Sequence, residues 1–585
     1  MKKLAGSVLM LLALAAALPA QGTAITAPLR FDQYYPLDQV YEALQALHKA
    51  YPRLTTLETV GRSDEGRPIM AMTVVNPKTG AALDKPGMYV DGNMHGNEIQ
   101  GGDISLYLLD YLLGNYGKNP EVTALVDKAC FYVVPVVNVD GRYHFFADAN
   151  TPDSSRTLRI PTDDDHDGLL DEDPPEDLDG DGNICTMRKK DPFGQYRTDP
   201  EEPRLMVRVK PGEKGEWTLL GDEGLDNDGD GQVNEDEPGY VDGNRNWGFD
   251  WAPPYVQSGS GDFPFSGSGL KALAEWTMTK PNICFAWSFH NNGGMFLRGP
   301  SRKGLGEYPP QDVAVYDFLG KQGERIIPGY RYLISWKDLY STYGDSGEWM
   351  TQTMGAYFYC AEVFQTESET FKGASERPEE GSRGEEAVRD IFGGSSDRER
   401  LKYSDNVVQG ELYKPWKPFQ HPVYGDIEIG GWAKMSSRLG APFMIKDLVH
   451  RNAMAVLFSA KHLPDVALDV FEVKPLGGGL YRVRTRLSNP KALPTMSYLA
   501  QRARLYPQDT LTVGGPGAKV VAGGPLLDPY TDQVAYAKAR PELQFLVVPG
   551  FGKVEHQFLV QGKGEITVRF ASRHGGKLSK TIKLQ

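Results

Sequence analysis

Cysteine is scarce in this chain, and the pairing pattern that marks sulfur-bound metal sites is missing. Only four cysteines occur among 585 residues, at Cys130, Cys185, Cys284 and Cys360, and none lies in a CxxC pair. A structural zinc site built from thiolates is therefore not indicated. A chain of this size buries enough apolar surface to fold without disulfides, so we expect free, buried thiols.

Long hydrophobic runs are also missing beyond the first segment. Residues 1–24 begin with Lys2 and Lys3, continue as an apolar run from Val8 to Leu18 and end in small residues. This pattern is typical of a secretory signal peptide, and the run is short for a membrane span. We therefore expect residues 1–24 to be a signal peptide and the product to be secreted or periplasmic, with no membrane span.

Positive charge is in deficit, and the deficit is local. Lys and Arg number 63 against 77 Asp and Glu, which gives a formal net charge of −14. Such a balance disfavours nucleic acid as a partner, because phosphate binding requires a cationic surface. Residues 163–181 contain 11 acidic residues and residues 222–237 contain 8, and neither segment contains Lys or Arg. This clustering indicates cation binding.

Before about residue 430, short apolar runs alternate with amphipathic stretches. The runs typical of strands are 69–75, 88–92, 131–137 and 283–289, and the stretches with helical spacing are 36–50, 104–113 and 270–278. This alternation favours an α/β fold with a largely buried sheet.

The pattern changes after Gly430. Apolar and charged residues alternate in Leu480–Leu487 and again in Glu565–Phe570, and turn residues separate such runs. Alternation of this kind is typical of half-buried antiparallel strands. We therefore predict an all-β sandwich domain over residues 431–585.

Two histidines and a glutamate form the predicted zinc site. His95 and Glu98 follow directly after the apolar run 88–92, and His290 follows the run 283–289. The carboxyl ends of strands are where open α/β sheets place their ligands. Two imidazoles and one carboxylate around an open fourth position are typical of a hydrolytic zinc site.

The acidic segments contain three loops that resemble calcium loops, with alternating acids followed by glycine. The loop at 226–237 has the full spacing, ending in Glu237, whereas the other two lack an acid at the twelfth position and would need neighbouring acids. A solvated acidic insertion without calcium is the alternative, but so many uncompensated carboxylates repel one another. The predicted structural calcium ligands are Asp226, Asp228, Asp230 and Glu237, then Asp163, Asp165 and Asp167, then Asp177, Asp179 and Asp181.

A series of ordered motifs over residues 30–430 resembles the zinc metallocarboxypeptidases of the carboxypeptidase A type. The motifs are Gly61–Arg67, His95-x-x-Glu98, Asn138–Gly141, Asp242-x-Asn244-Arg245, His290, Tyr340, Gly344–Trp349 and Glu362. The resemblance implies an α/β/α sandwich with a mixed, mostly parallel central sheet. It also implies a catalytic domain at 25–430 that binds one zinc ion per chain, here interrupted by acidic insertions near 163–182 and 222–237.

The resemblance also implies roles for individual residues. Glu362 corresponds to the general base, with Glu367 as a local competitor. Asn244 and Arg245 correspond to the pair that holds the terminal carboxylate of the substrate. Asp242 corresponds to the carboxylate that orients His95.

Three further positions follow from the same resemblance. Tyr340 corresponds to the tyrosine that closes over bound peptide, although Tyr343 lies close by. Arg188 is the candidate for stabilising the oxyanion, with Lys189 and Lys190 as alternatives. Gly347 corresponds to the floor of the specificity pocket, where it offers neither charge nor bulk.

Together these features predict a secreted, zinc-dependent carboxypeptidase acting on peptide or protein C-termini. One alternative is a zinc amidohydrolase acting on cell-wall or modified peptides. Another is a calcium-dependent binding protein with a secondary hydrolase unit, which the β-rich tail would suit. The sequence carries no signal for an oligomeric state.

Overall fold

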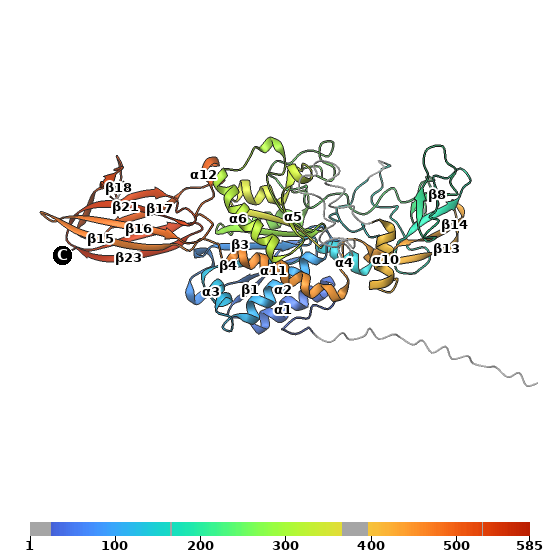
Figure 1. The fold of residues 1–585 in the computed structure, drawn as a ribbon, viewed down its shortest axis with the longest axis horizontal. Helices are drawn as coiled ribbons and strands as arrows, with labels where there is room; N and C mark the ends of the chain where they lie inside the picture. The colour runs from blue at the N-terminus through green and yellow to red at the C-terminus, as the bar shows by residue number, and fades with distance from the viewer. Residues whose placement is uncertain (1–24, 164–166, 365–395, 529, 585) are drawn as a thin grey trace, which may run out of the picture.

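The structure is a computed structural model, and it describes residues 25–163, 167–364, 396–528 and 530–584. The predicted signal peptide at 1–24, Asp165 and Glu367 lie outside the described residues. Figure 1 shows three parts along the long axis: a central α/β unit, a small sheet at one end and a β-sandwich at the other.

The central unit is built on an eight-stranded sheet with the order β1-β2-β4-β3-β9-β12-β10-β11. β3 pairs in parallel with β4 and β9, β12 with β9 and β10 with β11, whereas β1–β2, β2–β4 and β10–β12 are antiparallel. The strands are β1 (Thr55–Arg62), β2 (Pro68–Val74), β3 (Gly87–Gly92), β4 (Cys130–Val134), β9 (Ile283–Asn291), β10 (Met295–Arg298), β11 (Arg331–Ile334) and β12 (Tyr357–Val363). The predicted α/β fold with a mixed, mostly parallel sheet is confirmed.

Helices cover this sheet and share one apolar core with it. Every residue of β3 and β9 is buried, as expected for central strands that are covered on both faces. α11 packs between α2 and α6, and α5 packs against β1. The helices of the unit are α1 (Leu37–Ala50), α2 (Gln100–Asn115), α3 (Pro120–Lys128), α4 (Val139–Ala147), α5 (Ser268–Met278), α6 (Pro310–Ile326), α7 (Ser346–Glu348), α11 (Ile445–Ala460) and α12 (Tyr498–Ala503). A further helix, α10 (Asp397–Val407), packs its Leu401 in a separate apolar cluster with Leu205 and Tyr413.

A second, six-stranded sheet was not predicted. It has the order β13-β14-β5-β8-β6-β7, and its pairs are antiparallel. Its strands are β5 (Thr186–Lys190), β6 (Tyr196–Thr198), β7 (Met206–Arg208), β8 (Trp217–Asp222), β13 (Tyr413–His421) and β14 (Gly425–Trp432). The sheet therefore joins the acidic insertion to a segment more than two hundred residues further along the chain, because β5 pairs with β14.

The C-terminal β-sandwich consists of two antiparallel sheets around their own apolar core. The five-stranded sheet contains β15 (Ala467–Gly477), β16 (Leu480–Asn489), β18 (Ala518–Asp528), β19 (Gln533–Val534) and β21 (Gly552–Gly562). The four-stranded sheet contains β17 (Asp509–Gly514), β20 (Leu543–Leu546), β22 (Gly564–Ser572) and β23 (Gly576–Leu584).

The sandwich begins later than the predicted boundary at residue 431. β14 completes the second sheet, and α11 contributes Ile445, Val449, Val456 and Leu457 to the core of the central unit. The first strand of the sandwich starts at Ala467. Helix α11 therefore belongs to the central unit. The expectation of an all-β segment from residue 431 onward is wrong.

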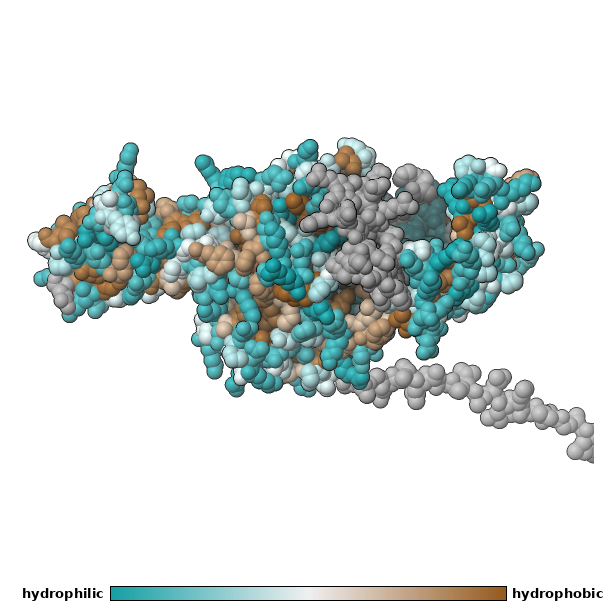
Figure 2. Space-filling view, viewed as in Figure 1, coloured by the Kyte–Doolittle hydropathy of each residue, from teal (hydrophilic) through white to brown (hydrophobic). Residues whose placement is uncertain are grey.

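The cysteines and the apolar composition of the helices bear on two predictions made from the sequence. All four cysteines are free, and Cys130, Cys185 and Cys284 are buried while Cys360 is partly exposed. Among the described residues, no helix has both the length and the apolar composition to cross a membrane. The face shown in Figure 2 is mostly hydrophilic, with scattered apolar patches.

Candidate active site

The three predicted zinc ligands meet at the carboxyl ends of two neighbouring parallel strands. His95 and Glu98 follow β3, and His290 lies near the end of β9, which pairs with β3. The Nδ1 of His95 lies 2.9 Å from Glu98 Oε2 and 3.2 Å from His290 Nδ1, and His290 Nδ1 lies 3.1 Å from the same carboxylate oxygen. All three side chains are buried. Residues more than 190 positions apart in sequence are thereby brought together.

The donor set fits a zinc ion. One donor atom of each residue lies within 4.8 Å of the others, and the set consists of two imidazole nitrogens and a carboxylate oxygen. The Nε2 of His95 lies 2.9 Å from Asp242 Oδ1, so this nitrogen carries the proton and Nδ1 presents a lone pair to the centre. A buried centre toward which nitrogen lone pairs and a carboxylate converge is stabilised by a cation.

Asp242 contacts His95 on the side away from the other two predicted ligands, where the resemblance placed an orienting carboxylate. Burial tends to raise the pKa of Asp242, but His95 and the guanidinium groups of Arg245 and Arg156 hold it well below its usual range. The carboxylate therefore stays ionised and fixes the tautomer of His95.

The loop that carries His95 is held by a buried network that was not predicted. Asn93 has a positive φ of 57°, and its Nδ2 donates to the carbonyls of His95 and Gly96 at 2.6 and 3.0 Å. Arg142, fully buried in α4, donates to Asn93 Oδ1 at 2.8 Å and forms an ion pair with Asp103 of α2 at 2.9 Å. Because both charges are buried and paired, this network fixes the loop between β3 and α2.

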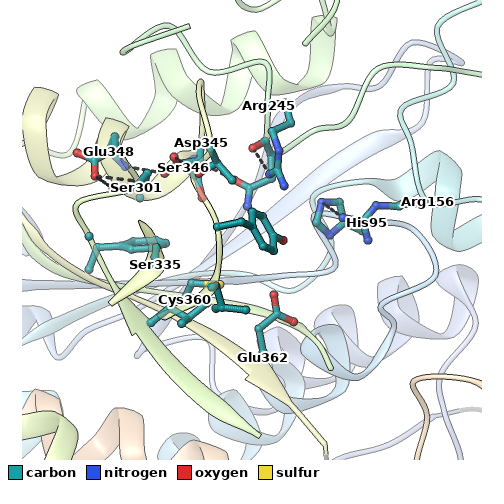
Figure 3. A pocket seen from close by; sticks show the side chains of 18 residues that line it. His95, Arg156, Arg245, Ser301, Ser335, Asp345, Ser346, Glu348, Cys360 and Glu362 are labelled. Atoms are coloured by element: carbon teal, nitrogen blue, oxygen red, sulfur yellow. Dashed lines mark hydrogen bonds between the residues drawn. The ribbon is translucent and has the colours of Figure 1, made fainter. Parts of the chain in front are cut away.

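Glu362 lies next to the metal ligands on β12. It pairs in register with His290 of the neighbouring strand β9, and it lines the cavity that His95 also lines. Figure 3 shows its carboxylate directed into this cavity. Burial of the carboxyl group, reinforced by repulsion from Glu98, raises the pKa of Glu362 to about 7. A carboxyl group with such a pKa can take up and release a proton at neutral pH.

The substrate-anchor residues line the same cavity. Arg245 is buried, and its Nη1 donates to the carbonyl of Asn244 at 2.8 Å. The Oδ1 of Asn244 accepts from the backbone N–H of Ser346 at 3.0 Å. Tyr340 also lines the cavity and is 49% exposed, whereas Tyr343 is not among the residues that line it.

The structure contradicts the expectation for Arg188. Its guanidinium lies between the indole rings of Trp217 and Trp416, at 4.0 and 3.9 Å from their centroids, and its Nε donates to Glu428 Oε2 at 2.9 Å. These partners all belong to the second sheet, and Arg188, Lys189 and Lys190 are absent from the residues that line the cavity. Because β5 pairs with β8 and β14 in that sheet, its basic side chains lie on the second sheet and not in the cavity.

Arg156 is the arginine that the structure places beside the predicted metal ligands. Its Nη1 donates to Glu98 Oε1 at 2.7 Å, and its Nη2 lies 3.1 Å from His95 Nε2 and 3.3 Å from Asp242 Oδ2. The side chain also lines the cavity, as Figure 3 shows beside His95. The only sequence signal was a lone arginine before the first acidic loop, which has no distinctive context.

The acidic loops form two described clusters. Asp226, Asp228 and Asp230 bring one oxygen each within 4.8 Å, and so do Asp177, Asp179 and Glu223. Glu223 is buried and was not predicted as a ligand, while Glu237 and Asp181 belong to neither cluster. Asp181 instead lies 3.3 Å from Lys414, and Asp179 lies 2.9 Å from Lys417.

Two of the acidic loops also dock on each other. The backbone N–H of Asp171 donates to Asp236 Oδ2 at 3.1 Å, and that of Asn234 donates to Asp173 Oδ2 at 3.0 Å. Asp173 and Asp236 are fully buried. The loops at 163–173 and 226–236 therefore make reciprocal contacts. Asp163 and Asp167 belong to neither of the two clusters.

Comparison with known proteins confirms the resemblance. Residues 40–163 match the family model of the zinc carboxypeptidases, and residues 465–583 match that of a domain of unknown function (DUF8731). The second match coincides with the sandwich, whose first strand starts at Ala467.

The curated relatives match over a limited segment. Carboxypeptidase D of Rattus norvegicus is 36% identical over 110 residues, which is 19% of this chain and 8% of that protein. Carboxypeptidase M of Mus musculus is 31% identical over 109 residues, or 19% of this chain and 25% of that protein. The matched segments thus span a quarter or less of these relatives.

Among solved structures, bovine thrombin-activatable fibrinolysis inhibitor, in complex with tick carboxypeptidase inhibitor, aligns with 74% of this chain and 98% of its own, at 16% identity and a TM-score of 0.41.

Proposed function

We propose that this chain is a zinc-dependent carboxypeptidase that hydrolyses the last peptide bond of its substrates. The observation that carries the proposal is the convergence of three kinds of group on one cavity: a zinc-binding triad, a carboxyl group poised near neutrality and a buried arginine. Of the residues assigned to the reaction, the zinc carboxypeptidase match covers His95, Glu98 and Arg156, so the placement of His290, Glu362 and Arg245 is independent support.

Each residue has a defined part in the reaction. Bound at His95, Glu98 and His290, zinc would polarise the scissile carbonyl and acidify the attacking water. Glu362 accepts the proton of that water and then delivers it to the nitrogen of the leaving amino acid, so that no net proton is consumed by the protein.

Positioning and charge stabilisation come from the arginines. Arg245, with the amide of Asn244 beside it, holds the terminal carboxylate of the substrate by charge-assisted hydrogen bonds. Arg156 donates hydrogen bonds toward the carbonyl oxygen as negative charge develops there. Tyr340 at the rim covers the bound peptide.

An exopeptidase fits this cavity better than the predicted alternatives. Arg245 forms no salt bridge among the described residues, so its guanidinium can pair with an anion in the cavity, and a free C-terminus supplies one, whereas an amidated C-terminus does not. A zinc amidohydrolase acting on cell-wall or modified peptides would share Glu362 and the triad, and cleavage of amide-blocked peptides would favour it. A binding protein with a secondary hydrolase unit would lose ligand attachment, but not peptidase activity, when the sandwich is altered.

The test of the proposed activity is Glu362→Gln, with zinc content and peptide hydrolysis measured together. We expect zinc binding to be retained and kcat to fall by about 10²–10⁴-fold, because only the proton relay is removed. Glu216→Gln, a matched change at an exposed position, should leave both unchanged. An intact protein that binds no zinc, or a Glu362→Gln variant with full activity, would contradict the proposal.

We further propose that the acidic insertion binds structural calcium. The support is the spacing of the loops together with the clusters at Asp226–Asp230 and at Asp177, Asp179 and Glu223. Carboxylate oxygens of this kind are the ligands that Ca²⁺ prefers. Export of the protein, which rests on residues 1–24, likewise remains a proposal.

A further inference from the structure

The cavity beyond the metal triad ends in carboxylates. Figure 3 shows His95 and Arg156 on one side, and Glu348 and Ser301 on the opposite side, with Asp345 and Ser346 between Glu348 and Arg245. Of the described residues that line the cavity, the only Lys or Arg residues are Arg156 and Arg245. The end of the cavity away from the metal site is therefore acidic.

Glu348 is buried without a cationic partner among the described residues. It is only 1% exposed, and its Oε1 accepts from the backbone N–H of Ser301 at 2.7 Å and from the hydroxyl of Tyr308 at 3.3 Å. Burial first, and then the neighbouring charge of Asp345, raise the pKa of Glu348 to about 7. Its carboxylate thus accepts hydrogen bonds from neutral donors and forms no salt bridge among the described residues, since Arg302, the cation whose pKa it raises, is paired with Asp250.

Asp345 also forms no salt bridge among the described residues, although its charge raises the pKa of Arg245. It is buried, its Oδ1 accepts from the backbone N–H of Glu348 at 3.0 Å, and its Oδ2 accepts from the hydroxyl of Thr342 at 3.1 Å. Two adjacent carboxylates that share a site with neutral donors repel each other. A cation placed beside them would relieve that repulsion and favour the ionised form of Glu348.

The rest of the wall suits a long side chain with a polar end. Leu297, Leu339 and Phe358 are apolar, and Ser301 and Ser335 offer hydroxyl groups. Apolar walls accommodate the methylene stem of Lys or Arg, while the charged end reaches the polar groups. Gly299 leaves room beside the carboxylate of Glu348, since a Cβ at this position would lie 2.7 Å from Glu348 Oε1.

We propose that the cavity selects substrates with a C-terminal Lys or Arg, and that Glu348, with Asp345 beside it, pairs with the cationic side chain. Arg245 and Asn244 hold the carboxylate of that same residue. This inference rests on the proposed function, and it supplies a preference that Gly347, with neither charge nor bulk, does not indicate. Gly347 does line the cavity, but residues on both sides of it supply acid.

The first test uses the wild-type, zinc-loaded chain and peptides that differ only in their last residue. We expect kcat/KM for Lys or Arg to exceed that for Leu or Phe by about tenfold or more, because a cation meets a buried unpaired carboxylate. C-terminal Glu should be the poorest substrate. Leu or Phe cleaved as well as Lys and Arg would overturn the inference and leave the carboxypeptidase proposal standing, whereas cleavage of none would count against that proposal itself.

The second test assigns the preference to Glu348. In Glu348→Gln the ratio of kcat/KM for Lys over Leu should fall by about tenfold or more, mainly through a higher KM for Lys. Glu307→Gln, a matched change at an exposed glutamate outside the cavity, should leave the ratio at its wild-type value. A ratio unchanged in Glu348→Gln would overturn the assignment. The wild-type panel decides the preference even if that variant fails to fold.

Discussion

At the scale of single residues, Arg156 and Arg188 show how tertiary context assigns a role to identical side chains. Both lie close to the first acidic loop in sequence, yet Arg156 contacts Glu98 and Arg188 lies between two tryptophan rings. A basic cluster in the sequence therefore points to a surface strand as readily as to a catalytic cation.

This difference gives a paired prediction. Arg156→Ala should lower kcat by about 10²–10³-fold, because it removes a donor to the developing oxyanion. Arg188→Ala should leave kcat near the wild-type value but lower the free energy of unfolding by about 1–2 kcal/mol, through lost stacking and the lost pair with Glu428. Steady-state kinetics and thermal unfolding of both variants check the pair. A larger loss of kcat in Arg188→Ala than in Arg156→Ala would reverse the assignment.

Some of the site could be predicted from the sequence because its signals are local. His95 and Glu98 follow one apolar run and His290 follows another, so their places at strand ends could be predicted, whereas Glu362 was assigned by the family resemblance. Glu348 and Glu223 could not be predicted, since the pKa of a carboxyl group is raised only when residues remote in sequence bury it. The same holds for Arg142 and Asp103, whose pairing depends on two helices packing together.

At the scale of secondary-structure elements, the second sheet was missed because its partners are remote and short. β6 and β7 have three residues each, and β5 pairs with a strand from the other end of the catalytic unit. α11 was missed for a different reason: the alternating strands of the tail were extended back over its helical spacing. The central sheet was predictable, since continuous apolar runs such as β9 are typical of buried strands.

The insertion is attached directly beside the active site. The backbone N–H of Leu158 donates to the carbonyl of Val241 at 2.8 Å, which places Arg156 and Asp242 at the two ends of the insertion side by side. If the acidic loops are well ordered, Arg156 and Asp242, which flank them in sequence and both contact His95, are held in place as well.

Removal of calcium should test this link. A selective calcium chelator, with zinc restored afterwards, should lower the thermal transition and raise KM. Calcium at 100 times its Kd contributes about 2.7 kcal/mol of stability. Asp226→Asn should weaken calcium binding and reproduce part of the effect, whereas Asp262→Asn, an exposed aspartate outside the loops, should not. Unchanged stability after chelation would contradict a structural calcium.

At the scale of the whole molecule, the sandwich is joined to the catalytic unit through buried polar contacts. The Nε of Arg573 donates to the carbonyl of Pro281 at 2.5 Å, and His574 beside it is 1% exposed. His462 lies between α11 and the sandwich, with its ring against Phe318 and Phe551. The junction and the sandwich therefore contain imidazoles that are poorly solvated.

These imidazoles give the sandwich a defined pH dependence. Burial lowers the pKa of His556 to about 4 and that of His574 to about 3, against about 6.5 in the unfolded chain. Because both folded-state pKa values are depressed, the stability that they contribute is present above about pH 6.5. It is lost as the pH falls toward 4, where the unfolded chain binds protons that the folded chain cannot. Each shift amounts to about 3 kcal/mol over that range.

We therefore expect the thermal transition of the sandwich to fall steeply between about pH 6.5 and 4. His556→Phe should flatten this dependence, because it keeps an aromatic ring next to Phe558 and removes one titrating group from the buried strand β21. His48→Phe, on helix α1 of the catalytic unit, should leave the slope for the sandwich as it is in the wild type. Calorimetry across this pH range measures all three proteins. An identical slope in His556→Phe and wild type would show that the acid sensitivity of the sandwich arises from other groups, whereas a flattened slope would assign part of that sensitivity to one buried imidazole, which destabilises the fold as the pH falls because only the unfolded chain can protonate it.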